Sequence, residues 1–159
     1  MRKGSVWLME EESKIIEKME TILREKAKEI FSEKIVDYGT NPKNYGAIDS
    51  PDGYAKESDE CGKDVEMFIR VRHGKVEESK FIAEGCIFTV AACNAAAEMS
   101  QGKTIQECFK INRSSIMNHL GGLPEDHIHC ALFAALIFQR ALRNYIVKNK
   151  RVRLIFEQI

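Results

Sequence analysis

Three cysteines, each next to a glycine or a histidine, are the residues of this chain best placed to do chemistry. They occur in the pairs Cys61-Gly62, Gly85-Cys86 and His129-Cys130, each where a predicted helix or strand begins or ends. A small fold brings such boundaries together at its surface, so three thiols and one imidazole could converge there. Thiolate and imidazole select zinc, iron or an iron–sulfur cluster, because magnesium and calcium prefer oxygen ligands. The pattern therefore indicates a metal or cluster site.

The other two cysteines, Cys93 and Cys108, are expected to pack in the core. Cys93 lies in an alanine-rich segment and Cys108 in a short amphipathic one, and a lone cysteine usually behaves as a small buried hydrophobe. Cys130 differs, since a helix N-terminus and a neighbouring imidazole favour the thiolate. No C-x-x-C pair occurs in the sequence. Spacing alone therefore leaves a metal site and simple packing equally open.

The composition is that of a soluble protein with one sizeable core. The chain has 159 residues, 44% of them hydrophobic, which favours one domain with an appendage. Its 24 basic and 24 acidic residues balance, so no global field attracts nucleic acid or an anionic membrane. Neither class of partner is expected.

A cytoplasmic location is expected from the targeting and cysteine patterns. The apolar run at residues 6–9 is too short for a signal-peptide core, and no apolar run approaches the roughly 18 residues of a membrane helix. Five cysteines are an odd number, which favours reduced thiols over a disulfide framework. A thiolate site requires that redox state.

The N-terminal part of the chain predicts a long amphipathic helix over about residues 10–37, broken near Ser32. Its apolar positions recur at steps of three and four residues; they are Ile15, Ile16, Met19, Ile22, Leu23, Ala27, Ile30 and Phe31. One interpretation is that the later turns pack on the domain's own core. The other is that the first turns form a helix–helix contact with another chain.

The middle of the chain predicts short strands, and the rest predicts helices. A short strand is expected at 54–58, and strict alternation from Val65 to Val71 predicts the next, followed by a turn at His73-Gly74 and a third strand at 76–83. Helices are expected at 87–100, at 104–110 with a capping box at Thr104, from about 114 to 120, and from Pro124 to Tyr145. That last helix would place Cys130 within about two turns of its start.

An ordered set of motifs resembles the IscU and NifU N-terminal family of iron–sulfur cluster assembly scaffolds, over about residues 30–148. The motifs are the segment 41–46 (NPKNYG), the Cys61-Gly62 turn before the alternating strand, Glu84-Gly85-Cys86, and Leu123-Pro124 leading to Ile128-His129-Cys130. The resemblance implies an α+β fold in which a small three-stranded antiparallel sheet packs against several helices. This domain would span residues 29–148, preceded by a helical extension at 1–28 and followed by a tail at 149–159.

The resemblance also implies a function. Cys61, Cys86 and Cys130 would hold a nascent cluster, expected to be of the 2Fe-2S type, or zinc in its place, with His129 as a fourth ligand. The cluster would be built from iron and from sulfur delivered by a cysteine desulfurase, with Cys130 as the persulfide acceptor, and would pass to apo-proteins. Such a scaffold is not an enzyme in the turnover sense.

Two departures from the family pattern stand out. The family usually carries an aspartate two residues after its first cysteine, where this chain has Lys63, and an ammonium cannot ligate a metal, so Asp64 or His129 would have to substitute. Lys63 would instead modulate the thiolates electrostatically. The family's chaperone-binding proline-valine-lysine stretch is replaced by 124–127 (PEDH). Lys63 and His127 are each interpreted either as solvated surface residues or as functional ones.

Two other functions are compatible with the sequence. The first is a zinc-bound sulfur acceptor for a cysteine desulfurase, as in the SufU branch, although the interval from Cys86 to Cys130 shows no insertion of the kind that branch carries. The second is an interaction module that lost its chemistry with the change to Lys63. In each case the N-terminal stripe would provide a contact for a desulfurase or for a second copy in a homo-oligomer.

Overall fold

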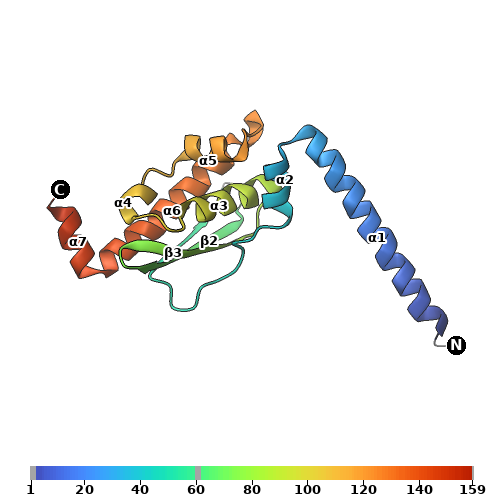
Figure 1. Ribbon diagram of the computed structural model, residues 1–159, viewed down its shortest axis with the longest axis horizontal. Coiled ribbons are helices and arrows are strands. Elements are labelled where there is room, and N and C mark those ends of the chain that lie inside the picture. The colour runs from blue at the N-terminus through green and yellow to red at the C-terminus, as the bar shows by residue number, and fades with distance from the viewer. Residues whose placement is uncertain (1–2, 60–61, 159) are drawn as a thin grey trace.

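A three-stranded antiparallel sheet, covered on one face by helices, forms the centre of the computed structural model, which describes residues 3–59 and 62–158 (Figure 1). The strands are β1 (Gly53–Ser58), β2 (Asp64–Arg72) and β3 (Lys75–Ala83), paired in that order. Together with the helices they confirm the predicted α+β class.

The alternating pattern of β2 decides which side chains enter the core. Val65, Met67 and Ile69 are fully buried, and Met67 lies opposite Phe81 of β3 in the register. A bulge at Arg70/Val71 interrupts the ladder. As predicted, the β2–β3 turn uses residues with positive φ, 52° at His73 and 73° at Gly74.

Helices α3 (Ile87–Ser100) and α6 (Ile128–Lys148) form the layer on the sheet. Helix α3 packs on β3 and α2, while α6 packs on β1, β2 and α3. The alanines of α3 at 91, 92, 95, 96 and 97 are fully buried, and such small side chains let helix backbones approach closely.

By length and composition, residues 125–148 could also span a membrane, contrary to the expectation from the sequence. Half of their most apolar window is buried in the core, which is typical of a core helix.

Two short helices lead from α3 to α6. Helix α4 (Ile105–Cys108) begins with the predicted capping box of Thr104 and Glu107. Helix α5 (Arg113–Leu120) ends at Gly121, whose φ of 81° is left-handed and favours glycine.

The start of α6 differs from the prediction. Pro124 has an extended backbone, with ψ at 147°, and it leads into one 3-10 turn, η1 (Glu125–His127), closed by a 2.9 Å bond from the His127 amide to the Pro124 carbonyl. Because α6 begins only at Ile128, Cys130 lies in its first turn.

The N-terminal helix breaks near Ser32, as predicted, into α1 (Lys3–Ile30) and α2 (Glu33–Thr40). The Ser32 hydroxyl accepts a hydrogen bond from the Ile35 amide and donates one of 2.5 Å to the carbonyl of Leu120, so it both caps α2 and ties it to α5. This clamp fixes the point where α1 leaves the domain.

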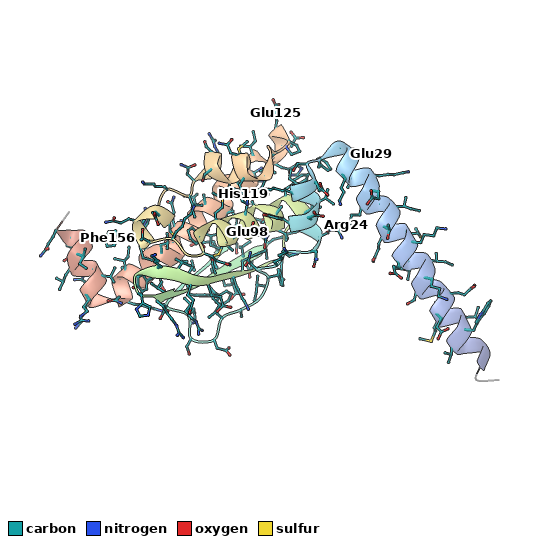
Figure 2. All side chains as sticks on the ribbon, in the orientation of Figure 1. Arg24, Glu29, Glu98, His119, Glu125 and Phe156 are labelled. Carbon is teal, nitrogen blue, oxygen red and sulfur yellow. The ribbon has the colours of Figure 1, made fainter. Side chains whose placement is uncertain are left out.

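Helix α1 projects away from the domain (Figures 1 and 2). Arg24 and Lys28 anchor it through ion pairs of 2.6 and 3.7 Å to Asp37 of α2. Its apolar stripe is 47% to 64% exposed along Ile15, Ile16, Met19, Ile22 and Leu23. The first turns therefore do not pack on the described core, in contrast to Phe31, which lies edge-on to Phe88.

The C-terminal tail forms one more helix, α7 (Lys150–Glu157). Asn149 caps it by accepting a hydrogen bond from the Val152 amide. Phe156 packs edge-on against Phe109, with ring centroids 6.2 Å apart. The tail thus docks on the domain.

Candidate metal and cluster site

Two of the three predicted cysteine ligands meet where α3 and α6 begin. Cys86 is the N-cap residue of α3, three positions after the end of β3, and Cys130 lies in the first turn of α6. The hydroxyl of Thr89 lies 3.5 Å from each of the two sulfurs and so links them. The fold therefore brings together thiols that are 44 positions apart in the sequence.

Close packing of backbone against Thr89 explains the glycine before Cys86. A Cβ atom at Gly85 would lie 2.7 Å from the Thr89 Cβ. Any larger residue would push Thr89 away from the sulfurs. Thr89 was not singled out from the sequence, but its spacing of three residues from Cys86 places both on one side of α3.

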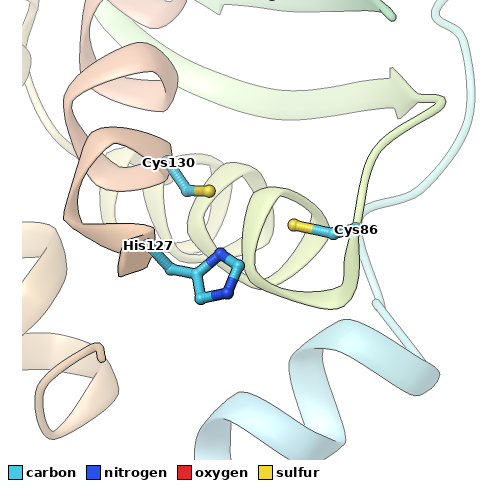
Figure 3. Close-up of side chains that lie close together, drawn as sticks. All are labelled: Cys86, His127 and Cys130. Atoms are coloured by element: carbon cyan, nitrogen blue, oxygen red, sulfur yellow. The ribbon is translucent and has the colours of Figure 1, made fainter. Parts of the chain in front are cut away.

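His127 is the third member of the group. Its imidazole and the sulfurs of Cys86 and Cys130 offer ligand atoms that all lie within 4.8 Å of one another (Figure 3). The sequence left this residue open between a solvated and a functional role. It lies three positions before Cys130, a spacing of about one helical turn that could have indicated the contact.

His129, the histidine predicted as a ligand, lies at the edge of this group. It is exposed, its Nε2 atom lies 3.7 Å from the Cys130 sulfur, and its ring centroid is 6.1 Å from that of His127. Among the described residues, the mutually close set contains His127 and not His129.

The β1–β2 turn and the start of β2 carry two candidate ligands, Cys61 and Asp64, and the residue predicted to modulate the site, Lys63. Cys61 lies outside the described residues, so its role as a ligand stays a prediction. Lys63 is exposed in a turn where its amide donates a 2.8 Å bond to the Asp59 carboxylate. Asp64 accepts a bond of 2.5 Å from the Ser58 hydroxyl and lies 3.4 Å from the Lys56 ammonium, and these contacts lower the pKa of its carboxyl. Its carboxylate is thus already paired.

The two clustered thiols differ in acidity. Burial raises the pKa of Cys86, but hydrogen bonds from the Thr89 hydroxyl and from the amides of Thr89 and Phe88 outweigh it, so the net pKa is lowered. Burial raises the pKa of Cys130 to about 11, and the nearby charge of Cys86 adds to the rise. The expectation that the helix start and the neighbouring imidazole favour the Cys130 thiolate is therefore wrong, because burial of the sulfur outweighs both. In the metal-free protein Cys86, which is exposed, is therefore the more reactive thiol of the two.

Cys93 and Cys108 lie in the hydrophobic core. Both are fully buried, and burial raises the pKa of Cys93 to about 12 and that of Cys108 to about 11. The four cysteines in the described part of the chain are free thiols.

The donor set suits a soft metal. Two thiols and one imidazole match zinc and iron, which bind sulfur and nitrogen, and do not match magnesium or calcium. The Nδ1 atom of His127 is buried and has no hydrogen-bond partner among the described residues. An unpaired buried nitrogen is costly in an apolar setting, and a metal ion would satisfy it.

Known proteins share this arrangement of sequence and fold. The family model described as the NifU-like N terminal domain matches residues 30–152. Iron-sulfur cluster assembly scaffold protein IscU 1 of Archaeoglobus fulgidus is 36% identical over 124 residues, which cover 77% of this chain and 81% of that relative. The protein named iron-sulfur cluster assembly scaffold protein IscU of Azotobacter vinelandii is 31% identical over 126 residues, or 76% of this chain and 96% of the relative.

A solved structure agrees in fold. The crystal structure of a protein described as an iron-sulfur cluster assembly scaffold for the SUF system of Fervidobacterium islandicum superposes with a TM-score of 0.50 at 23% identity. The match covers 74% of this chain and 95% of that one. The family model matches residues 30–152, which is most of the chain, and the chain therefore belongs to the family of the NifU-like N-terminal domain.

Proposed function

We propose that this protein is a scaffold on which an iron–sulfur cluster is assembled and from which the cluster passes to apo-proteins. The observation that carries the proposal is the convergence of Cys86, His127 and Cys130 at the N-terminal ends of α3 and α6. Thiolates are the usual ligands of such clusters. Cys61 completes the set of three cysteine ligands in this proposal. Iron and sulfur are the cargo, and the protein holds them without turning over a substrate.

The sulfur comes from the persulfide of a cysteine desulfurase. A thiolate of the scaffold attacks the terminal sulfur, a new S–S bond forms as the bond to the desulfurase cysteine breaks, and that cysteine leaves as a thiolate. We propose Cys130 as the acceptor. Without metal, Cys130 is the less reactive of the two clustered thiols, being only 2% exposed with a raised pKa. The proposal therefore requires that iron bind first, because a thiol that coordinates a metal is deprotonated.

A second candidate function is a zinc-bound sulfur acceptor for the same class of enzyme. The observation that favours it is the Cys86, His127 and Cys130 set itself, because two thiolates and an imidazole with one further ligand make a common zinc site. In that case the bound ion is zinc and only sulfur is passed on.

A second copy of the chain is the partner proposed for α1. Glu12, Met19 and Lys26 are spaced seven residues apart along the exposed stripe, which is close to two helical turns. In an antiparallel pair centred on Met19, Glu12 of one copy faces Lys26 of the other at both ends. A parallel pair would place like charges together, which is unfavourable. We therefore propose an antiparallel homodimer through α1.

We also propose a cytoplasmic location, because reduced thiols persist there. The four described cysteines are free thiols, and the proposed chemistry uses three cysteines in that form.

Absorbance of protein purified without oxygen separates the candidate functions. A scaffold gives a brown protein with iron and sulfide, a zinc-bound acceptor gives a colourless protein with about one equivalent of zinc, and an inert module gives neither.

Changing Cys61, Cys86 or Cys130 to serine should each remove most of the metal, since a hydroxyl replaces thiolate poorly at a soft ion. Cys93→Ser and Cys108→Ser are the matched controls and should keep it. Metal retained by the first three variants and lost from the controls would refute the proposal.

A further inference from the structure

A groove without charged residues lies at the corner where α1 meets the domain. Ile30 and Phe31 line it from the α1–α2 junction, and residues 121–124 line it from the segment after α5, together with Ser32 and Ile35. Its volume is about 320 Å³. An apolar cavity of about 150 Å³ holds one benzene molecule, so this groove has room for about two apolar side chains.

The groove borders the candidate metal site. Phe31 meets Phe88 edge-on, with ring centroids 5.2 Å apart, and Phe88 in turn stacks on His127. Pro124 also lines the groove and lies three positions before His127. A group that occupies the groove therefore packs on the same stack of rings as the site.

The first turns of α1 carry four consecutive apolar residues. Val6, Trp7, Leu8 and Met9 are 56% to 69% exposed. Successive residues of a helix are rotated by about 100°, so four in a row cover every side of it. A helix that is apolar all round is normally buried. Because a simple pair of helices covers only one side of each, this turn requires a concave surface.

The first turns of α1 do not reach the groove of their own chain. Helix α1 projects away from the domain, with its N-terminus at the far end (Figure 1). Leu8 and Ile30 are 22 positions apart in this helix, which corresponds to about 33 Å at 1.5 Å per residue. A turn of this kind must therefore come to the groove from another molecule.

The register proposed for the α1 dimer brings the turn of a second copy to this place. In an antiparallel pair centred on Met19, Leu8 of one copy faces Ile30 of the other, because each lies eleven residues from Met19. Eleven residues are about three helical turns, so both belong to the same stripe. Ile30 is the last residue of α1 and is 75% exposed. The helix of the second copy therefore continues past the end of α1, at the groove.

We propose that the groove receives the first turns of α1 from a second copy of the chain, with Leu8 seated on Ile30 and with Trp7 and Met9 on its flanks. This inference rests on the homodimer proposed above and deepens it, since it adds a contact beside the metal site to the contact between the two stripes. A two-fold axis repeats every contact, so each copy covers the groove of the other.

The first test is photo-crosslinking of the full-length reduced protein with p-benzoylphenylalanine in place of Leu8. A mixture of 15N-labelled and unlabelled copies distinguishes links between chains from links within one chain. Mass spectrometry of the peptides should place the link between chains, at residues 30–35 or 121–124. The matched control carries the same group in place of Glu10, which lies two positions on and so on about the opposite side of the helix. It should not link to the groove.

The second test is a single substitution in the groove, measured by analytical ultracentrifugation. Ile30→Glu should raise the dissociation constant of the dimer about tenfold or more, because it buries a charge in the contact. Val147→Glu is the matched control, since Val147 is also apolar and 65% exposed but lies on α6. Thermal unfolding checks the fold of each variant. Cobalt(II), whose absorbance reports thiolate ligands, should bind both variants as it binds wild type.

The outcomes separate this inference from the scaffold function. Links from position 8 that lie outside the groove, a dimer that is as tight in Ile30→Glu as in wild type, or a wild-type protein that stays monomeric each overturn the inference and leave cluster assembly standing. Links in the groove of a protein that takes up neither cobalt nor iron and sulfide support the contact and overturn the scaffold function.

Discussion

The imidazole of His127 lies nearly flat on the ring of Phe88, with centroids 4.0 Å apart, and Phe31 meets the same phenyl ring edge-on at 5.2 Å. This stack joins the α1–α2 junction, the first turn of α3 and the η1 turn. Phe88, which has no ligand atom, thereby positions the imidazole of His127, which has one.

Replacing Phe88 with leucine should weaken cobalt binding while leaving every ligand in place. The substitution keeps much of the volume but removes the flat surface under His127, so the imidazole loses its fixed orientation. We expect a loss of cobalt affinity and a destabilisation of about 1–2 kcal/mol. Phe68→Leu is the matched control, because Phe68 is similarly buried and packs on Tyr54. Equal cobalt affinities for the two variants would contradict the positioning role.

Alkylation of the metal-free protein should follow the acidity of the thiols. Although burial raises the pKa of Cys86, hydrogen bonds from Thr89 lower it overall, whereas burial raises the pKa of Cys130 to about 11 and that of Cys93 to about 12. Iodoacetamide at neutral pH should therefore modify Cys86 well before Cys130 and Cys93, as measured by peptide mass spectrometry over time. Thr89→Val should slow the reaction at Cys86. Faster labelling at Cys130 than at Cys86 would show that the order is wrong.

Glu98 should contribute to stability only above acidic pH. Burial raises its pKa, but hydrogen bonds from Tyr38 and His119 outweigh that and hold the pKa of Glu98 below its usual range. A carboxyl whose pKa is lower in the folded protein than in the unfolded chain stabilises the fold at any pH above its unfolded pKa, which is about 4.3 for glutamate. This stabilisation is lost as the pH falls through the pKa of the folded protein.

We therefore expect Glu98→Gln to cost about 0.5–1 kcal/mol at pH 7, a modest figure because the side chain is 43% exposed. In urea unfolding, the difference from wild type should shrink as the pH falls through the lowered pKa of Glu98. Glu125→Gln, at the exposed tip of η1, is the control. A difference in unfolding free energy that grows on acidification would mean that the folded pKa of Glu98 is raised and not lowered.

Lys63 should tune cluster transfer without holding the cluster. Lys63→Ala should leave metal content unchanged, since an ammonium is no ligand, whereas Lys63→Asp adds an oxygen donor on the β1–β2 turn and should change the transfer rate. The measurement is the rate at which a reconstituted cluster passes to an apo-ferredoxin. Equal transfer rates for wild type and both variants would show that Lys63 has no effect on cluster transfer.

Helix α1 should be needed for association and not for metal binding. Deleting residues 1–28 removes the exposed stripe and the Arg24 and Lys28 ion pairs but retains Phe31 and the Ser32 clamp. Light scattering should show a dimer for the full chain and a monomer for the truncated one, with cobalt affinity unchanged. An unfolded truncation would instead show that α1 belongs to the domain's core.

Charge reversal tests the antiparallel register of this dimer. Lys26→Glu should weaken the dimer, because each Glu12 would then face a like charge, and adding Glu12→Lys should restore it. A double variant that stays monomeric would mean that the pairing is different.

The sequence by itself determined the elements whose signals are local. The alternation from Val65 to Val71 predicts β2 because a strand places alternate side chains on opposite faces, and the Thr104 capping box and the break at Ser32 are decided by hydrogen bonds within one turn. The ordered motifs around the cysteines also predicted the family, which the match to residues 30–152 confirmed.

Only the tertiary structure decided which histidine lies close to both described thiols. His127 and His129 are two residues apart and equally able to bind a metal, and the choice depends on the single 3-10 turn after Pro124 and on the ring of Phe88 from another helix. The link through Thr89, the paired state of Asp64 and the docking of the tail by Phe156 on Phe109 likewise depend on contacts between distant segments. Such contacts carry no local signal, because the chain must fold before the partners meet.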